Sequence, residues 1–170
     1  MRKILFACCF SMFTFYSSGQ NNIEISLQQD VRLFLVGDQK GNSPLTVNFL
    51  SKIEIPVYNL KKNYLSTYLS VEYADLVVRN YKRYAMGVGY IVKSIYRRIG
   101  AGAYLDFGKI YRQKEGFSSF SLSGELNYNI NDRLKFIVTQ QITDRKDLKV
   151  LYDSKNGYVI SGFVGLKFSL

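Results

Sequence analysis

Apolar and polar side chains alternate with a period of two along most of the chain, from Ile23 to the C-terminus. This is the period of a β-strand with two different faces, whereas a helix repeats every 3.6 residues. Turn-forming residues interrupt the alternation, and the connections alternate between longer and shorter ones. The pattern predicts no helix and eight strands, over residues 23–37, 45–58, 64–73, 84–93, 98–110, 118–130, 133–144 and 158–170.

Eight consecutive strands of this kind are expected to close into an up-and-down barrel, because closure leaves no unpaired edge strand. Two closed forms share the same alternation. In a soluble, lipocalin-like barrel, either periplasmic or secreted, the apolar side chains point inward and bind an apolar ligand. In an outer-membrane barrel they point outward against lipid, and the polar side chains fill the lumen.

The composition of the polar face favours the membrane form. Small residues suit the narrow lumen of an eight-stranded barrel, whereas a water-facing surface does not require them. The small residues of this face include Ser66, Ser70, Ala85, Gly87, Gly89, Gly100, Gly102 and Gly108. Tyr68 is expected to lie opposite Gly89, a large side chain against a small one. The fold class predicted is therefore all-β, an eight-stranded antiparallel up-and-down transmembrane β-barrel.

Aromatic residues gather near both ends of the predicted strands, on the apolar face. Membrane barrels carry such aromatic girdles at both lipid–water interfaces. One set comprises Tyr73, Tyr84, Phe107, Phe120 and Tyr158, and the other comprises Tyr128, Phe136 and Phe168.

Charged residues in the strands fall on the polar face, with Lys109 as an exception near a strand end. Charges that lose water must be paired, so we expect a plug of ion pairs that holds the barrel together. Simple hairpin registers would pair Lys52 with Glu72 and Lys135 with Glu125. The predicted network consists of Lys52, Glu54, Glu72, Asp106, Glu125, Lys135 and Lys167. A narrow path for protons or very small solutes is the alternative.

The first nineteen residues have the layout of a cleaved secretory signal peptide. Two basic residues are followed by a mostly apolar stretch, residues 4–16, and by Ser17-Ser18-Gly19 before a cut ahead of Gln20. The predicted organisation is a signal peptide over residues 1–19 and a barrel domain over residues 20–170.

The residue types present argue against catalysis. The 170 residues include no histidine, the commonest general base and metal ligand. Cys8 and Cys9 both lie in the leader, so the mature chain would have no thiol. Asp106 and Glu125 could perform acid–base chemistry, but the balancing bases favour ion pairing instead. We therefore predict no enzymatic activity, no metal site and no cofactor.

The formal net charge of +10 falls to +8 when the two bases of the leader are removed. The surplus bases lie in the connections at both rims. This distribution suits anionic lipid headgroups better than nucleic acid, which would require a single basic stripe.

The mature chain as a whole resembles the small eight-stranded outer-membrane β-barrel proteins of Gram-negative bacteria. Its last strand is similar to their terminal assembly signal, with Gly165, Phe168 and Leu170 at the signal's glycine and its alternate apolar or aromatic positions. Phe163 departs from that signal, because a polar residue is usual there, and Leu170 replaces the commoner Phe.

This resemblance implies a monomer in the outer membrane, with a structural, surface-contact or accessory role. It also implies contacts with outer-membrane lipids and lipopolysaccharide, and handling by periplasmic chaperones and the outer-membrane assembly machinery.

Overall fold

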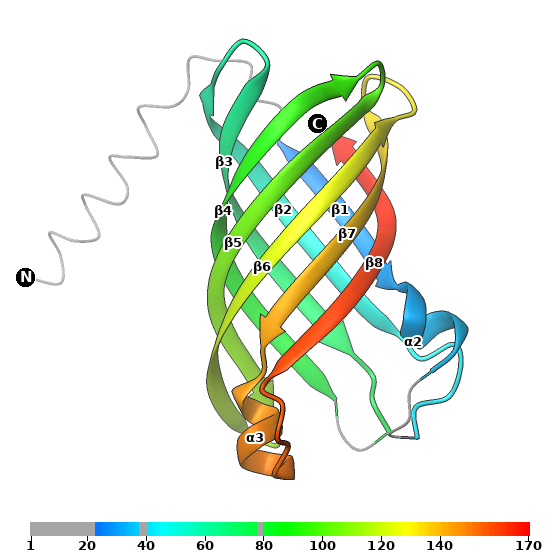
Figure 1. Ribbon diagram of the computed structural model, residues 1–170, viewed down its shortest axis with the longest axis vertical. Helices are drawn as coiled ribbons and strands as arrows, with labels where there is room; N and C mark the ends of the chain where they lie inside the picture. The colour runs from blue at the N-terminus through cyan, green and yellow to red at the C-terminus, as the bar shows by residue number, and fades with distance from the viewer. Residues whose placement is uncertain (1–22, 38–40, 78–79) are drawn as a thin grey trace, which may run out of the picture.

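The computed structural model describes residues 23–37, 41–77 and 80–170, so the predicted leader lies outside the described residues. Eight antiparallel strands form one closed barrel, in which each strand pairs with its neighbours in the chain and β8 pairs with β1 (Figure 1). The fold class predicted from the alternation is confirmed. The strands are β1 (Glu24–Asp30), β2 (Asn48–Asn59), β3 (Asn63–Ala74), β4 (Tyr81–Tyr96), β5 (Ile99–Arg112), β6 (Glu115–Asn129), β7 (Leu134–Asp144) and β8 (Tyr158–Ser169).

The two ends of the barrel differ. The turn end, at the top of Figure 1, carries the short connections 60–62, 97–98 and 130–133 and the C-terminus. The loop end, at the bottom, carries the described residues of two connections, 36–37 with 41–47 and 75–77 with 80, and the connections 113–114 and 145–157.

The strand register fixes how far the strands tilt. We can step from Lys82 on β4 to its partner on the neighbouring strand, and from there to the next strand, until the circuit of the barrel is complete. The circuit returns to β4 at Val92, ten residues further along the strand, because the strands are staggered. A closed barrel of this kind has its strands tilted by about 35–45° from the axis. With eight strands, the interior is just wide enough for side chains to fill.

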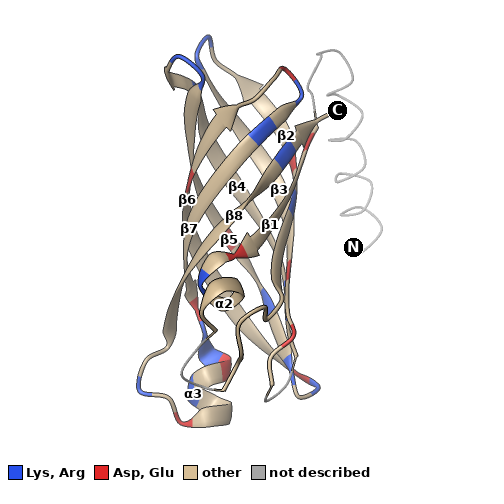
Figure 2. Ribbon diagram, turned by 90° about the vertical axis from the view of Figure 1, so that its right-hand side faces the viewer, with Lys and Arg blue, Asp and Glu red and all other residues tan. Residues whose placement is uncertain are grey.

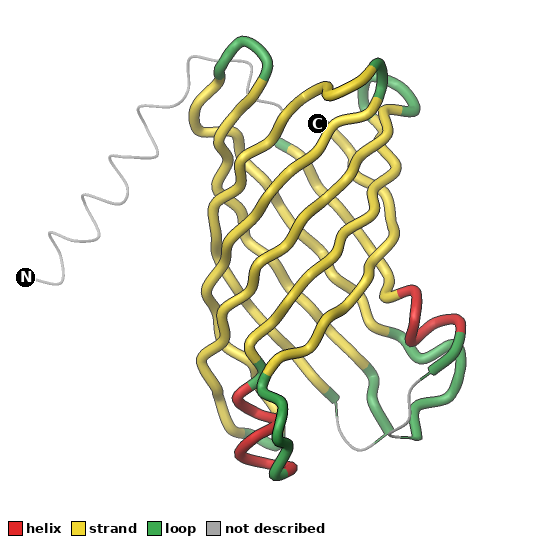
Figure 3. The backbone as a smooth tube through the Cα atoms, in the orientation of Figure 1, coloured by secondary structure: helices red, strands yellow, loops and turns green. Residues whose placement is uncertain are grey.

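Two short helices, α2 (Val31–Leu35) and α3 (Lys146–Tyr152), lie at the loop end (Figure 3). The prediction that the first strand continues to residue 37, and that the chain has no helix, is wrong. Asp30 ends β1 and caps α2, because its carboxylate accepts a hydrogen bond of 3.0 Å from the backbone N–H of Leu33. The alternation of Val31, Leu33 and Leu35 did not reveal this cap.

The hairpin between β5 and β6 is longer than predicted. These strands were expected to end at residue 110 and to begin again at residue 118. They continue instead to a two-residue turn at Gln113 and Lys114, whose φ angles of 54° and 70° are both positive. Two consecutive positive φ angles give the type I′ turn, which matches the twist of the flanking strands.

The apolar parity of every strand faces outward and the polar parity faces inward. Phe107 and Leu126 are 61% and 57% exposed on the outer face, whereas Glu54 is 1% exposed in the lumen. This arrangement is the reverse of a soluble barrel with an apolar interior. In the described part of the chain, no helix is both long and apolar enough to cross a membrane.

Candidate functional site

Lys167 of β8 is the centre of an ion-pair network inside the lumen. Its Nζ lies 3.3 Å from Glu54 Oε2 and 3.8 Å from Glu24 Oε2, and it also pairs with Glu125. The three carboxylates belong to β2, β1 and β6. One ammonium group, only 2% exposed, therefore connects four strands across the barrel.

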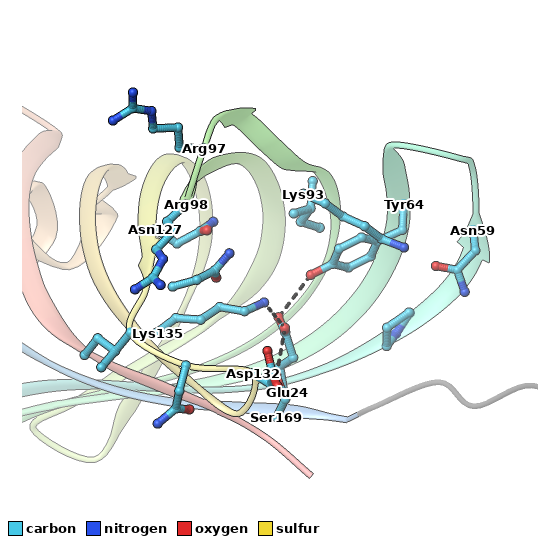
Figure 4. A pocket seen from close by; sticks show the side chains of 15 residues that line it. Glu24, Asn59, Tyr64, Lys93, Arg97, Arg98, Asn127, Asp132, Lys135 and Ser169 are labelled. Carbon is cyan, nitrogen blue, oxygen red and sulfur yellow. Dashed lines mark hydrogen bonds and ion pairs between the residues drawn. The ribbon is translucent and has the colours of Figure 1, made fainter.

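Two further lysines complete this network. Lys52 lies 3.5 Å from Glu125 and 4.3 Å from the centre of the Tyr104 ring, and Lys135 pairs with Glu24. Three ammonium groups thus face three carboxylates, which leaves no net charge in this part of the lumen. Figure 4 shows how the side chains of Tyr64, Lys135 and Ser169 converge on Glu24.

The expected pairs Lys52–Glu72 and Lys135–Glu125 do not form. In the register, Lys52 lies opposite Ser70, so Glu72 is only a diagonal neighbour on the next strand. The Lys52 side chain instead crosses the lumen to β6. Glu72 accepts hydrogen bonds from Tyr81 Oη at 3.2 Å and from Gln141 Nε2 at 3.4 Å.

Two tyrosines fill the middle of the lumen. The rings of Tyr68 and Tyr104 meet edge to face, with their centres 5.5 Å apart. A Cβ atom at Gly87 would come within 2.8 Å of Tyr68, and one at Gly89 within 2.6 Å of Tyr104. The expectation of a tyrosine packed against a strand glycine therefore holds, but the residue opposite Tyr68 is Gly87 and not Gly89.

Arg83 of β4 is a lumen residue that the sequence prediction missed. It pairs with Asp106 and donates a hydrogen bond of 3.0 Å to Ser119 Oγ, while Tyr68 donates one of 2.8 Å to Asp106. The strand was predicted to begin at residue 84, so Arg83 was counted among the loop charges. Continuing the alternation one residue toward the N-terminus would have placed it in the lumen.

A second set of ion pairs closes the loop end. Asp147 of α3 accepts two hydrogen bonds of 2.8 Å from Arg145 and lies 3.4 Å from Arg112. Arg145 also stacks over Tyr81, 4.1 Å from the ring centre. Burial raises the pKa of Asp147, but the hydrogen bonds and charges of the two arginines outweigh this effect and hold it below its ordinary value. The sequence had placed these charges in a solvated loop.

Arg32 falls on the polar face of the predicted first strand, residues 23–37, which would place it in the lumen, but it lies exposed on α2. Lys109, the predicted exception, does face outward, next to Tyr84 on β4.

The side chains that fill the middle of the lumen separate two cavities, one at each end of the barrel. The turn-end cavity measures about 500 Å³ and is lined in part by Glu24, Tyr64, Lys93, Arg98, Asn127 and Lys135. The loop-end cavity measures about 870 Å³ and is lined in part by Asp30, Asn48, Glu72, Arg112, Arg145 and Leu148. Tyr68, Tyr104 and Arg83 line neither cavity, so these side chains occupy the segment of lumen between them.

The three residues of the predicted assembly signal have different surroundings. Gly165 faces the lumen so close to β1 that a Cβ atom there would lie 2.0 Å from the Leu27 carbonyl oxygen. Phe168 faces outward between Ile25 and Leu134. Leu170 follows β8 and is exposed. Phe163, the departure from the signal, is fully buried in the lumen.

The buried acids of the lumen are engaged in ion pairs and hydrogen bonds. Within residues 23–37, 41–77 and 80–170, no three side chains of the metal-ligating types gather to hold an ion. The buried carboxylates are held by lysines, arginines and tyrosines, which is the arrangement that stabilises charges removed from water.

A closed eight-stranded barrel with an apolar exterior and a charged, side-chain-filled interior is the fold of the small outer-membrane β-barrels. The resemblance inferred from the sequence is thereby confirmed at the level of fold. No family model matches the chain, and no curated protein matches it by sequence.

Solved structures of the outer membrane protein Ail of Yersinia pestis, the attachment invasion locus protein, are similar to this chain. The backbone structure of Ail in a phospholipid bilayer nanodisc superposes with a TM-score of 0.54 at 12% identity, covering 89% of this chain and 100% of Ail. The crystal structure of Ail gives a TM-score of 0.49 at 11% identity, covering 88% of this chain and 96% of Ail. At these identities the likeness is one of fold.

Proposed function

We propose that this protein is a non-enzymatic component of the outer membrane, with an envelope-structural, surface-contact or accessory role and a permanently plugged lumen. The contrast between the two faces of the barrel carries this proposal. Large apolar side chains cover the outside of every strand, whereas the inside holds paired charges, serines and tyrosines.

The proposed location and orientation follow from the leader and from the connections. Residues 1–19 would direct export and be removed. Outer-membrane barrels have short turns on the periplasmic side and longer loops outside. The turn end would therefore face the periplasm, and α2, α3 and the long loops would face outward.

The proposed partners include lipopolysaccharide, through the outer face near the loop end. Lys82 and Lys109 are outward-facing bases on neighbouring strands, and Tyr73, Tyr84 and Tyr111 surround them. Lys82 lies 5.9 Å from the centre of the Tyr73 ring. Lysines bind phosphate as point charges, and tyrosines favour the headgroup level, so this patch suits phosphate groups of the outer leaflet.

Insertion would involve periplasmic chaperones and the outer-membrane assembly machinery, which we propose recognise β8 through Gly165, Phe168 and Leu170. The protein would act as a monomer, because a closed barrel has no free strand edge.

Planar-bilayer recording tests the plug. The purified barrel is expected to show no steady conductance at neutral pH, because the lumen is filled between the two cavities. An open sixteen-stranded porin in the same bilayer is the positive control. A reproducible open channel would favour a narrow pore for very small solutes over a structural or accessory role.

A further inference from the structure

The turn-end cavity has a surplus of positive charge that the ion pairs of the lumen do not neutralise. Its lining includes the bases Lys93, Arg97, Arg98 and Lys135 and the acids Glu24 and Asp132. Lys135 and Lys167 already pair with Glu24. The turns around the cavity add further bases, and Figure 2 shows Lys and Arg in the turns at the top of the barrel.

Lys93 and Arg98 are the bases of this cavity that are available to a ligand. In the described part of the chain, neither forms an ion pair with a carboxylate. The ammonium group of Lys93 lies 5.8 Å from the centre of the buried Tyr64 ring, on the cavity wall. Arg97 differs, because its guanidinium stacks at 5.2 Å on Tyr96, which does not line the cavity, whereas the ring under Lys93 is part of the cavity wall.

The rest of the lining consists of polar side chains and a buried base. Four asparagines, Asn59, Asn127, Asn129 and Asn131, contribute to the wall. Tyr64, Ile91 and Asn127 are buried and hold its base in place. A cleft with low-dielectric walls and a surplus of charge of one sign focuses the electric field, and so attracts ions of the opposite sign.

We propose that the turn-end cavity binds the carboxylate or phosphate group of a small, water-borne solute through Lys93 and Arg98. The cavity opens within the ring of strands and not on the outer face, so the ligand reaches it from water and not from lipid. Its volume of about 500 Å³ is that of a small-molecule site. This inference rests on the barrel and the cavity, and it holds whether or not the lumen conducts.

Titration calorimetry on the barrel refolded in zwitterionic micelles tests the proposal at low salt. One arm uses inorganic phosphate and the other uses an acidic dipeptide of two glutamates, which distinguishes the two sources of the anion. The K93Q/R98Q variant is expected to bind the preferred anion about tenfold more weakly than the unmodified chain, because two charge-assisted contacts are lost. Both residues are exposed, so folding should be unaffected.

The matched control is K61Q, which removes one positive charge from a neighbouring turn outside the cavity lining. It is expected to leave binding within about twofold of the unmodified chain, because Lys61 does not line the cavity and so makes no direct contact with an anion held there. Equal losses in K61Q and K93Q/R98Q would overturn the proposal in favour of a diffuse basic rim. Absence of heat with both anions for the unmodified chain would overturn it outright.

Discussion

Replacing Lys167 with Met is expected to destabilise the barrel by about 3–5 kcal/mol. The substitution keeps most of the side-chain volume but leaves Glu24, Glu54 and Glu125 with two ammonium groups instead of three. A carboxylate that is buried without a partner is costly because it has lost both water and its counter-charge. Urea-dependent unfolding in lipid vesicles measures the change.

Two companion variants separate charge from packing. Lys135→Met removes a partly exposed member of the same network, and its effect should be clearly smaller because Glu24 keeps Lys167 and Tyr64 as partners. Adding Glu125→Gln to Lys167→Met restores the balance of charge and should recover part of the lost stability. A loss below about 1 kcal/mol for Lys167→Met would mean that the network does not hold the strands together.

Replacing Val138 with Arg is expected to cost about 2–4 kcal/mol, because this side chain faces lipid near the middle of the membrane. Val138 faces outward between its partners Val164 on β8 and Leu126 on β6. These residues belong to the circuit of strand partners that runs from Lys82 at the loop end to Val92 at the turn end, and Val138 lies between the two ends. The same unfolding titration measures the change in free energy.

The matched substitution is Ser118→Arg, at an outward position beside Lys109 near the loop end. A basic residue close to the interface costs only about 0–1 kcal/mol, since it can reach water and phosphate. Equal tolerance of arginine at both positions would show that the outer face is not embedded as the fold implies.

The eight-stranded architecture was predictable because apolar and polar side chains alternate with a period of two, and eight separate segments of the chain show this alternation. Each strand contributed independent evidence for the same two faces, and the small residues of one face indicated which of them is the lumen. Gly87 and Gly89 are examples from the lumen face. Tyrosines of neighbouring strands pack against both, and a larger residue at either position would collide with them.

The ion pairs were not predictable, because they depend on the stagger of the strands around the whole barrel. Lys52 reaches Glu125 across the lumen, and a hairpin-by-hairpin register contains no information about that distance. The ion pairs at the loop end were not predicted for a related reason. Arg83, Arg145 and Asp147 appear as loop charges in the sequence, whereas in the fold Arg83 pairs with Asp106 inside the lumen and Arg145 pairs with Asp147 of α3.

Cell fractionation followed by gel migration with and without heating tests most directly whether this chain is a membrane-embedded barrel. The full chain, expressed in a Gram-negative host, is expected in the outer-membrane fraction and should migrate differently before and after boiling, because a closed barrel resists detergent until it is heated. A soluble product whose migration does not change with heat would contradict the assignment of the apolar face to lipid.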